Sequence, residues 1–150
     1  MILFEIKEQF QGQIDETLLK ETVLATLEYL GETKNVGLTV IVTGNAQIQA
    51  LNRRYRNVDA PTDVLSFSAG DTDPSTQERY LGDVLISYPK AELQSQAREH
   101  SVEAELQLLV VHGVLHLLGC DHANPDEKSR MWGLQSEILA KLGLDIEITQ

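Results

Sequence analysis

The sequence predicts one α+β domain over residues 1–150, in which a small mixed β-sheet is covered by helices. The chain is 150 residues long, which suits a single domain able to bury about two-thirds of its unfolded surface. Its 42% hydrophobic and 23% charged residues are ordinary for a globular protein. Strand-like and helix-like apolar patterns follow one another in mixed order, which indicates α+β packing.

The first half of the chain holds two strand patterns and two helix patterns. Apolar residues that alternate with other residues indicate a strand, and apolar residues at spacings of three and four indicate a helix. A glycine supplies a C-terminal stop for the first helix. The predicted elements are a strand at Ile2–Ile6, a helix from Asp15 to Gly31, a strand at Val36–Val42, and a helix opened by Gly44 and Asn45 with Ile48, Leu51 and Tyr55 on its inner face.

Loops rich in turn residues separate the elements of the second half. Residues 57–63 contain a proline and two aspartates, and residues 69–79 are rich in Asp, Ser, Thr, Gly and Pro, so both are predicted as loops, the second flexible. The longest helix is apolar almost all round, which predicts that it lies buried at the centre of the domain. The remaining predicted elements are strands at Val64–Phe67 and Val84–Ile86 and helices at Pro89–Ala97, Ser101–Leu118 and Pro125–Leu142.

Several features bear on cellular location. Cys120 is the single cysteine, so no internal disulfide is expected, as is usual in a reducing cytosol. The N-terminus lacks the basic start and long apolar core of a signal peptide. The longest apolar run, residues 106–119, is broken by two histidines and is too short to cross a bilayer. We therefore expect a cytoplasmic protein with no membrane partner.

The charge distribution gives conflicting indications about nucleic-acid binding. Twelve basic residues against 23 acidic ones give a net charge of −11, which repels polyanions at long range and argues against nucleic-acid binding. Arg53, Arg54 and Arg56, however, form a local cationic cluster. By itself this cluster is equally consistent with a solvated helix face and with a site for a negatively charged substrate.

Three of the four histidines lie within HGVLHLLGCDH, residues 112–122. A lone histidine in an apolar helix is more often a core residue with a satisfied hydrogen bond. His112 and His116, however, stand one helical turn apart, with Cβ atoms about 6 Å from each other, so both rings can reach one point. A tetrahedral zinc needs ligand nitrogens roughly 3.3 Å apart, which two converging imidazoles can supply.

The third histidine follows a glycine that can end the helix. Gly119 readily adopts the left-handed conformation that turns the chain, so His122 can swing back toward the same point. We therefore predict one Zn²⁺ per chain, held by His112, His116 and His122. Three neutral nitrogens are the ligand count of a catalytic zinc, which leaves a fourth position for water.

Cys120 and Asp121, just before His122, could be metal ligands or have other roles. A closed structural site would need a fourth protein ligand, but Cys120 stands so close to His122 that both could bind one metal only through a strained turn. We interpret Cys120 as a small buried hydrophobic residue. Asp121 is either an acceptor that orients a histidine ring or a turn residue.

The histidine spacing of 0, 4 and 10 with glycine at 7 also occurs in the metzincin proteases, so the central helix is zincin-like. In those enzymes a glutamate directly after the first histidine is the general base for peptide hydrolysis. Here that position is Gly113, which can take no proton. A peptidase is therefore disfavoured.

The same stretch resembles the signature of the bacterial YbeY endoribonucleases, H-G-x-L-H-L-x-G-Y-D-H, and departs from it only at Cys120, where tyrosine is usual. That departure leaves the three ligand positions intact. The resemblance covers roughly residues 45–142. Two further blocks are similar to the family. The first consists of Leu51-Asn52, Tyr55-Arg56 and Pro61–Phe67. The second consists of Leu81–Val84 and Ile86-Ser87.

The resemblance implies a zinc-dependent endoribonuclease that cleaves single-stranded RNA. It implies a role in ribosomal RNA maturation, notably at the 3′ end of 16S rRNA, and in ribosome quality control, with small-subunit ribosomal proteins as candidate partners. The functionally important arginine of the family falls on Arg56, which would stabilise phosphate charge as the catalytic cation. Arg53 and Arg54 are candidate substrate-binding residues.

A second class of function stays open at this point: a ribosome-assembly or protein-binding module whose metal is structural. An exchangeable water on the metal favours the enzyme, and a fourth protein ligand favours the module. The motif also does not separate zinc from nickel or another ion that prefers imidazole. His100 is expected to be an exposed residue at a helix start with no role, and Asp63 either shapes the loop beside the site or forms a turn before a strand.

Overall fold

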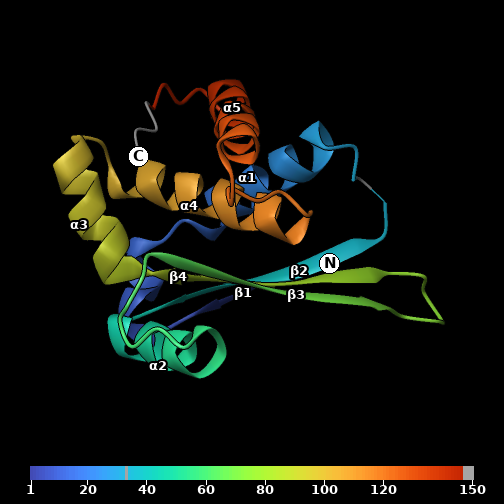
Figure 1. Ribbon diagram of the computed structural model, residues 1–150, viewed down its shortest axis with the longest axis horizontal. Coiled ribbons are helices and arrows are strands. Elements are labelled where there is room, and N and C mark those ends of the chain that lie inside the picture. Colours follow the sequence, from blue (N-terminus) through green and yellow to red (C-terminus); the bar gives the residue numbers. More distant parts are fainter. Residues whose placement is uncertain (33, 147–150) are drawn as a thin grey trace.

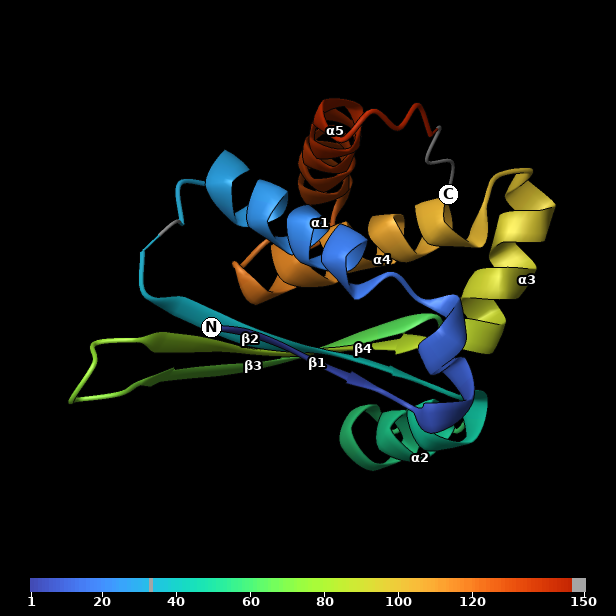
Figure 2. The ribbon, with the colours of Figure 1, turned by 180° about the vertical axis from the view of Figure 1, so that it is seen from behind.

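A buried helix, α4 (Val102–Leu117), lies at the centre of the computed structural model, which describes residues 1–32 and 34–146. Figures 1 and 2 show α4 and α1 (Glu16–Tyr29) on one face of the sheet, with α5 (Pro125–Lys141) packed on the far side of α4. Almost every side of α4 is therefore covered, which is the physical reason for its nearly continuous apolar sequence.

The sheet has four strands in the order β1-β2-β4-β3. The central strand β2 runs parallel to both β1 and β4, whereas β3 runs antiparallel to β4. The predicted small mixed sheet covered by helices is thus confirmed, and β3 forms one edge of it. The strands are β1 (Ile2–Ile6), β2 (Val36–Thr43), β3 (Val64–Thr72) and β4 (Arg79–Ser87).

The prediction of a flexible loop over residues 69–79 was wrong at both ends of this range, where the structure has strands. Strands β3 and β4 form a long hairpin whose pairing extends to Thr72 opposite Arg79, with a register shift after Ser68. The distal half of this hairpin projects beyond the helices (Figure 1). Since water covers both of its faces there, the strands carry no apolar alternation, and the sequence therefore resembled a loop.

Two smaller helices complete the architecture. Helix α2 (Asn45–Arg56) packs on the opposite face of the sheet, and α3 (Tyr88–Arg98) stands at one end of α4 (Figure 2). A short 3-10 helix at Glu8–Gln13 was not predicted. Tyr55, placed by the sequence on the inner face of α2, is 58% exposed, because Ile48 and Asn52 occupy that face instead.

Three apolar clusters hold these layers together. The largest lies between the sheet and α1 and α4, the second joins α4 to α5, and the third joins the sheet to α2. The described residues therefore form a single α+β domain. Among them, no helix combines the length and the apolarity needed to cross a membrane.

Gly113 sets how closely α4 approaches the sheet. A Cβ atom at this position would lie 2.4 Å from Cγ1 of Val84 on β4, well inside van der Waals contact. The Ser66 hydroxyl of β3 also donates to the Gly113 carbonyl at 3.0 Å. The backbone of α4 thus rests directly on the sheet, one residue after the first histidine of the motif.

We expect Gly113→Ala to lower the free energy of unfolding by about 1–3 kcal/mol, because the added methyl group overlaps a β-branched side chain in a packed core. Gly133→Ala is the matched control. Gly133 is also helical, but an added Cβ there meets nothing within 4 Å. This change should stabilise the protein by about 0.5–1 kcal/mol, since alanine is the better helix former. Urea denaturation of both variants measures the difference, and equal effects would contradict the close approach.

Candidate metal centre

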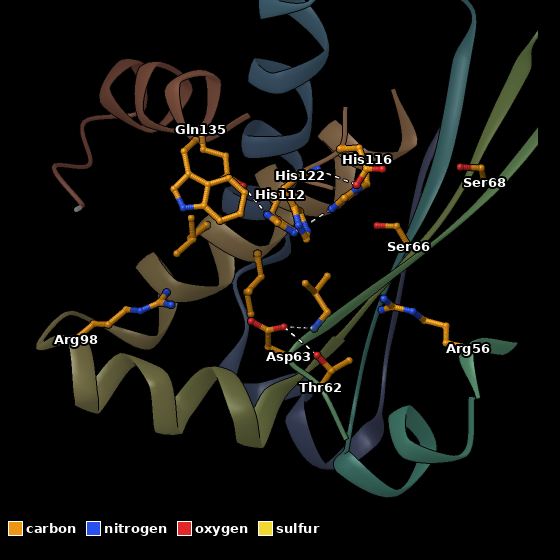
Figure 3. Close-up of a pocket in the computed structure, with 15 residues that line it drawn as sticks. Arg56, Thr62, Asp63, Ser66, Ser68, Arg98, His112, His116, His122 and Gln135 are labelled. Carbon is orange, nitrogen blue, oxygen red and sulfur yellow. Dashed lines mark hydrogen bonds between the residues drawn. The ribbon is translucent and has the colours of Figure 1, made fainter. Parts of the chain in front are cut away.

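Three histidines converge at the C-terminal end of α4. His112 and His116 lie on adjacent turns of the helix, and His122 follows in the loop (Figure 3). The Nε2 atoms of His112 and His116 are 3.2 Å apart, close to the roughly 3.3 Å expected of two ligands on one tetrahedral zinc. One ring nitrogen from each of the three histidines falls within 4.8 Å of the others. These residues could therefore hold one metal ion.

The turn after α4 brings the third histidine back. Gly119 adopts a φ of +95°, in the region that favours glycine, and the Cys120 amide donates to the Leu115 carbonyl at 3.0 Å. The Asp121 carboxylate then accepts the His122 amide at 2.7 Å. Asp121 is therefore a turn residue, as one of the two sequence interpretations had it.

Gln135 is the residue of the site that sequence analysis missed. Its side chain is buried on α5, and its Oε1 lies 2.6 Å from Nδ1 of His112. Since an amide oxygen only accepts, this contact places the proton on Nδ1 and leaves Nε2 free as a ligand atom. The one available signal was a polar residue on the apolar face of α5, between Met131 and Ile138.

Burial keeps the helical imidazoles neutral, which metal binding requires. Desolvation lowers the pKa of His112 below its ordinary value of 6.5, against the opposing effect of the Gln135 hydrogen bond. Burial, followed by repulsion from His112 and His122, lowers the pKa of His116 to about 4. Both rings are thus neutral at neutral pH without help from a metal, and the His112 ring, protonated on Nδ1, presents a free Nε2.

Cys120 does not join the histidines. It packs at the edge of the apolar cluster between α4 and α5, and burial raises the pKa of its thiol. Within residues 1–32 and 34–146, the group able to hold a metal contains His112, His116 and His122 and no cysteine or carboxylate. Cys120 therefore packs as a small hydrophobic residue, as the sequence interpretation had it, but it is half-buried rather than fully buried.

A cavity of about 640 Å³ opens beside the histidines. Figure 3 shows Ser66 and Ser68 of β3 on one wall and Thr62 and Asp63 on the floor. The Asp63 carboxylate accepts the Val64 amide at 2.8 Å. Asp63 therefore both forms the turn before β3 and lines the cavity, so the two interpretations of this residue are compatible.

The three arginines of α2 separate into two groups. Arg56 lines the cavity, whereas Arg53 and Arg54 are exposed and are not among its lining residues. The guanidinium of Arg54 instead stacks over the Tyr55 ring, 5.1 Å from its centroid. In the part of the chain that the structure describes, Arg56 makes no hydrogen bond or ion pair, so its guanidinium remains available to a ligand.

The expectation for His100 was wrong. Its side chain is only 17% exposed, and its Nε2 lies 2.6 Å from Oε1 of Glu105, which is fully buried. A histidine before a helix resembles an exposed capping residue in sequence. The packing of α3 against α4, which the sequence does not reveal, is what encloses it.

Gly113 also gives a structural reason to reject a metzincin-type peptidase. Any side chain at this position would enter the space held by Val84. A glutamate base therefore has no room at the position where those proteases carry it. The site has the histidine spacing of a zincin but cannot accommodate its base.

We expect Gln135→Leu to weaken metal binding about 10–100-fold, because His112 loses the hydrogen bond that fixes its tautomer and ring orientation. Gln107→Leu is the matched control. Gln107 is likewise buried, but it donates to Thr22 at 3.1 Å, away from the histidines. This control should change stability without changing metal affinity. Competitive titration with a chromogenic chelator measures both variants, and equal affinities would exclude the orienting role.

We also expect the His116 ring of the chelator-treated protein to titrate near pH 4 in NMR spectra. Because the folded-state pKa lies below the unfolded value of about 6.5, His116 contributes stability that is complete above pH 6.5. This contribution is lost as the pH falls toward 4. A His116 midpoint at or above 6.5 would show that the ring is not held in its neutral form.

A mixed-sheet domain with three convergent histidines beside a polar, arginine-lined cavity belongs to the class of metal-dependent hydrolases. Comparison with known proteins narrows this class. The family model described as "Endoribonuclease YbeY" matches residues 4–143. This chain belongs to the YbeY endoribonuclease family, and the match extends well before residue 45, where the sequence resemblance was first evident.

Individual relatives agree. The chain is 40% identical to "Endoribonuclease YbeY" of Roseiflexus sp. (strain RS-1), over 95% of this chain and 93% of that protein. It is 39% identical to the protein of the same name from Brevibacillus brevis, over 96% of this chain and 99% of that protein. The solution structure of TM1509 from Thermotoga maritima is similar, with a TM-score of 0.59 and 26% identity over 95% of this chain and 92% of that one.

Proposed function

We propose that this chain is a zinc-dependent endoribonuclease that cleaves single-stranded RNA and acts in ribosomal RNA maturation at the 3′ end of 16S rRNA. The observation that carries the proposal is the convergence of three histidine nitrogens and an unpaired Arg56 on one cavity. The family supplies the substrate class, since its relatives are named endoribonucleases. Ribosome quality control, small-subunit ribosomal proteins as partners and a cytoplasmic location belong to the same proposal.

The donor set fits one zinc per chain. His112, His116 and His122 offer three imidazole nitrogens within 4.8 Å of one another, and those of His112 and His116 are 3.2 Å apart, close to the separation that tetrahedral coordination needs. When bound, the metal supplies a Lewis acid for a phosphoryl oxygen and lowers the pKa of a water to about 7. The absence of a carboxylate or cysteine from this group of described residues favours an open catalytic site over a closed structural one.

The protein residues have separate roles in this mechanism. Gln135 holds the His112 ring in place, so the ligand geometry exists before substrate arrives. Arg56 faces the cavity from the end of α2 and binds the oxygens of the scissile phosphate, where negative charge grows in the transition state. A planar guanidinium matches two phosphate oxygens at once.

The net charge of −11 is compatible with RNA binding if the contacts are local. Arg56 and the metal concentrate positive charge in the cavity, and Arg53 and Arg54 extend it along the exposed face of α2. These two side chains are proposed to contact RNA outside the cavity. Weak intrinsic affinity would make docking on a ribosomal partner useful.

The test separates metal binding from phosphate binding. His116→Ala should lose most of the zinc and the RNA cleavage together, because two imidazoles rarely hold zinc tightly. Arg56→Ala should retain about one zinc per chain and the melting temperature, yet lose about a hundredfold or more in cleavage rate. Arg56→Lys should restore little, since a point charge does not copy the planar fork.

Zinc content, melting temperature and cleavage of a single-stranded RNA are measured for each variant. Cys120→Ser is the control and should keep both metal and activity. Arg56→Ala that cleaves like the unaltered chain would remove the arginine from the mechanism. Zinc loss on Cys120→Ser would instead favour a structural four-ligand site, and so a ribosome-assembly or protein-binding module.

A further inference from the structure

A second charged group borders the cavity on the side away from Arg56. Its centre is Glu105 of α4, whose side chain is 0% exposed. Arg98, the last residue of α3, contacts both carboxylate oxygens through Nη1, at 2.9 and 3.2 Å. His100 Nε2 lies 2.6 Å from Oε1, and the Gln94 amide, in the orientation that its neighbours require, donates to Oε2 at 2.9 Å.

Only one of these partners of Glu105 also faces the cavity. Arg98 lines it, whereas His100 and Gln94 do not. Among the described residues, the polar side-chain atoms that are buried without a partner are Asn52 Oδ1 and Trp132 Nε1. The Nε and Nη2 groups of Arg98 are not among these buried atoms, and no described residue forms a hydrogen bond with them. They are therefore open to water and to a ligand. A guanidinium can thus hold Glu105 on one side and an anion on the other.

Arg98 is held at a different level of α4 from the histidines. Glu105 precedes His112 by seven residues, or about 10 Å along the helix axis at 1.5 Å per residue. Leu108 and Leu109 line the cavity over that interval. Figure 3 shows Arg98 and Arg56 on opposite sides of the histidine group. The two arginines therefore face different parts of any strand that crosses the cavity.

We propose that Arg98 binds a second phosphate of the RNA strand, one or two nucleotides from the scissile one, and that buried Glu105 is the positioning residue that holds it there. The strand would run from Arg56 past the histidines and along Leu108 and Leu109 to Arg98. This inference rests on the proposed cleavage of RNA at the histidine site. It assigns a substrate-binding role to a residue outside the metal-binding motif.

The ion pair of Arg98 differs from an ordinary surface pair of the same chain. Arg79 and Glu32 form an ion pair at 3.0 Å, but their side chains are 45% and 39% exposed and lie outside the cavity. Arg98 is 25% exposed, and its carboxylate partner has lost all contact with water. A fully buried carboxylate is costly unless several donors satisfy it, and this one has them from three residues. The arrangement fixes a guanidinium at the cavity wall.

The experiment measures cleavage of a short single-stranded RNA at several salt concentrations. Arg98→Ala should raise KM roughly tenfold with little change in kcat, and should reduce the slope of log KM against log salt by about one. Arg98→Lys keeps a charge for Glu105 but has no planar fork to share with a phosphate, so it should recover stability and not KM. Arg79→Ala is the matched control and should leave KM unchanged.

A double variant distinguishes loss of RNA binding from misfolding. Arg98→Ala combined with Glu105→Gln removes both charges, so no unpaired carboxylate remains in the core, and it should fold and show the same raised KM. Substrates with one neutral methylphosphonate at each position then locate the contact. The unaltered chain should lose affinity at one position beside the scissile phosphate, and the Arg98 variants should be insensitive at that same position.

The outcomes separate this inference from the proposed function. An unaltered chain that cleaves no single-stranded RNA overturns both. If it cleaves RNA, but the double variant has the KM and the salt slope of the unaltered chain, then Arg98 only neutralises Glu105 and this inference alone fails. The inference is supported if the Arg98 variants, unlike the unaltered chain, lose no affinity when one particular phosphate is replaced by a methylphosphonate.

Discussion

The contact between α4 and β4 at Gly113 is the constraint on which the site depends. Because the helix backbone lies against Val84, α4 sits deep in the domain, with α5 closing over its outer side. This depth gives the histidines their surroundings: Gln135 reaches His112 from α5, and the cavity forms between α4 and the edge strand β3. The close approach of α4 to the sheet therefore places the histidines between β3 and α5.

Burial of α4 links stability to chemistry. The desolvation that lowers the pKa values of His112 and His116 comes from the same packing that forms the core. Neutral rings with their Nε2 atoms 3.2 Å apart need little rearrangement to accept a metal ion. In the metal-free state, that proximity is tolerable because neither ring is charged at neutral pH. The fold therefore prepares the ligand set rather than relying on the ion to assemble it.

The arrangement of charge explains how an acidic chain can belong to a family of RNA-cleaving enzymes. The net charge of −11 is a property of the whole surface, whereas binding depends on the charges that line the cavity. Arg56 and Arg98, the last residues of α2 and α3, line it from opposite sides of the histidine group (Figure 3). Phosphate groups would meet these cations at short range, where they outweigh the diffuse acidic surface.

The sequence by itself determined the α+β class, the buried central helix and the histidine group, because helical periodicity and the i, i+4 spacing are local properties of the chain. Tertiary structure alone decided the role of Gln135, the burial of His100 and the position of Arg98, since each depends on a helix distant in sequence. It also revealed the β3–β4 hairpin, whose water-exposed strands lack the alternation that marks a strand. Contacts between separate elements follow from the packing of whole helices and sheets, which no short stretch of sequence encodes.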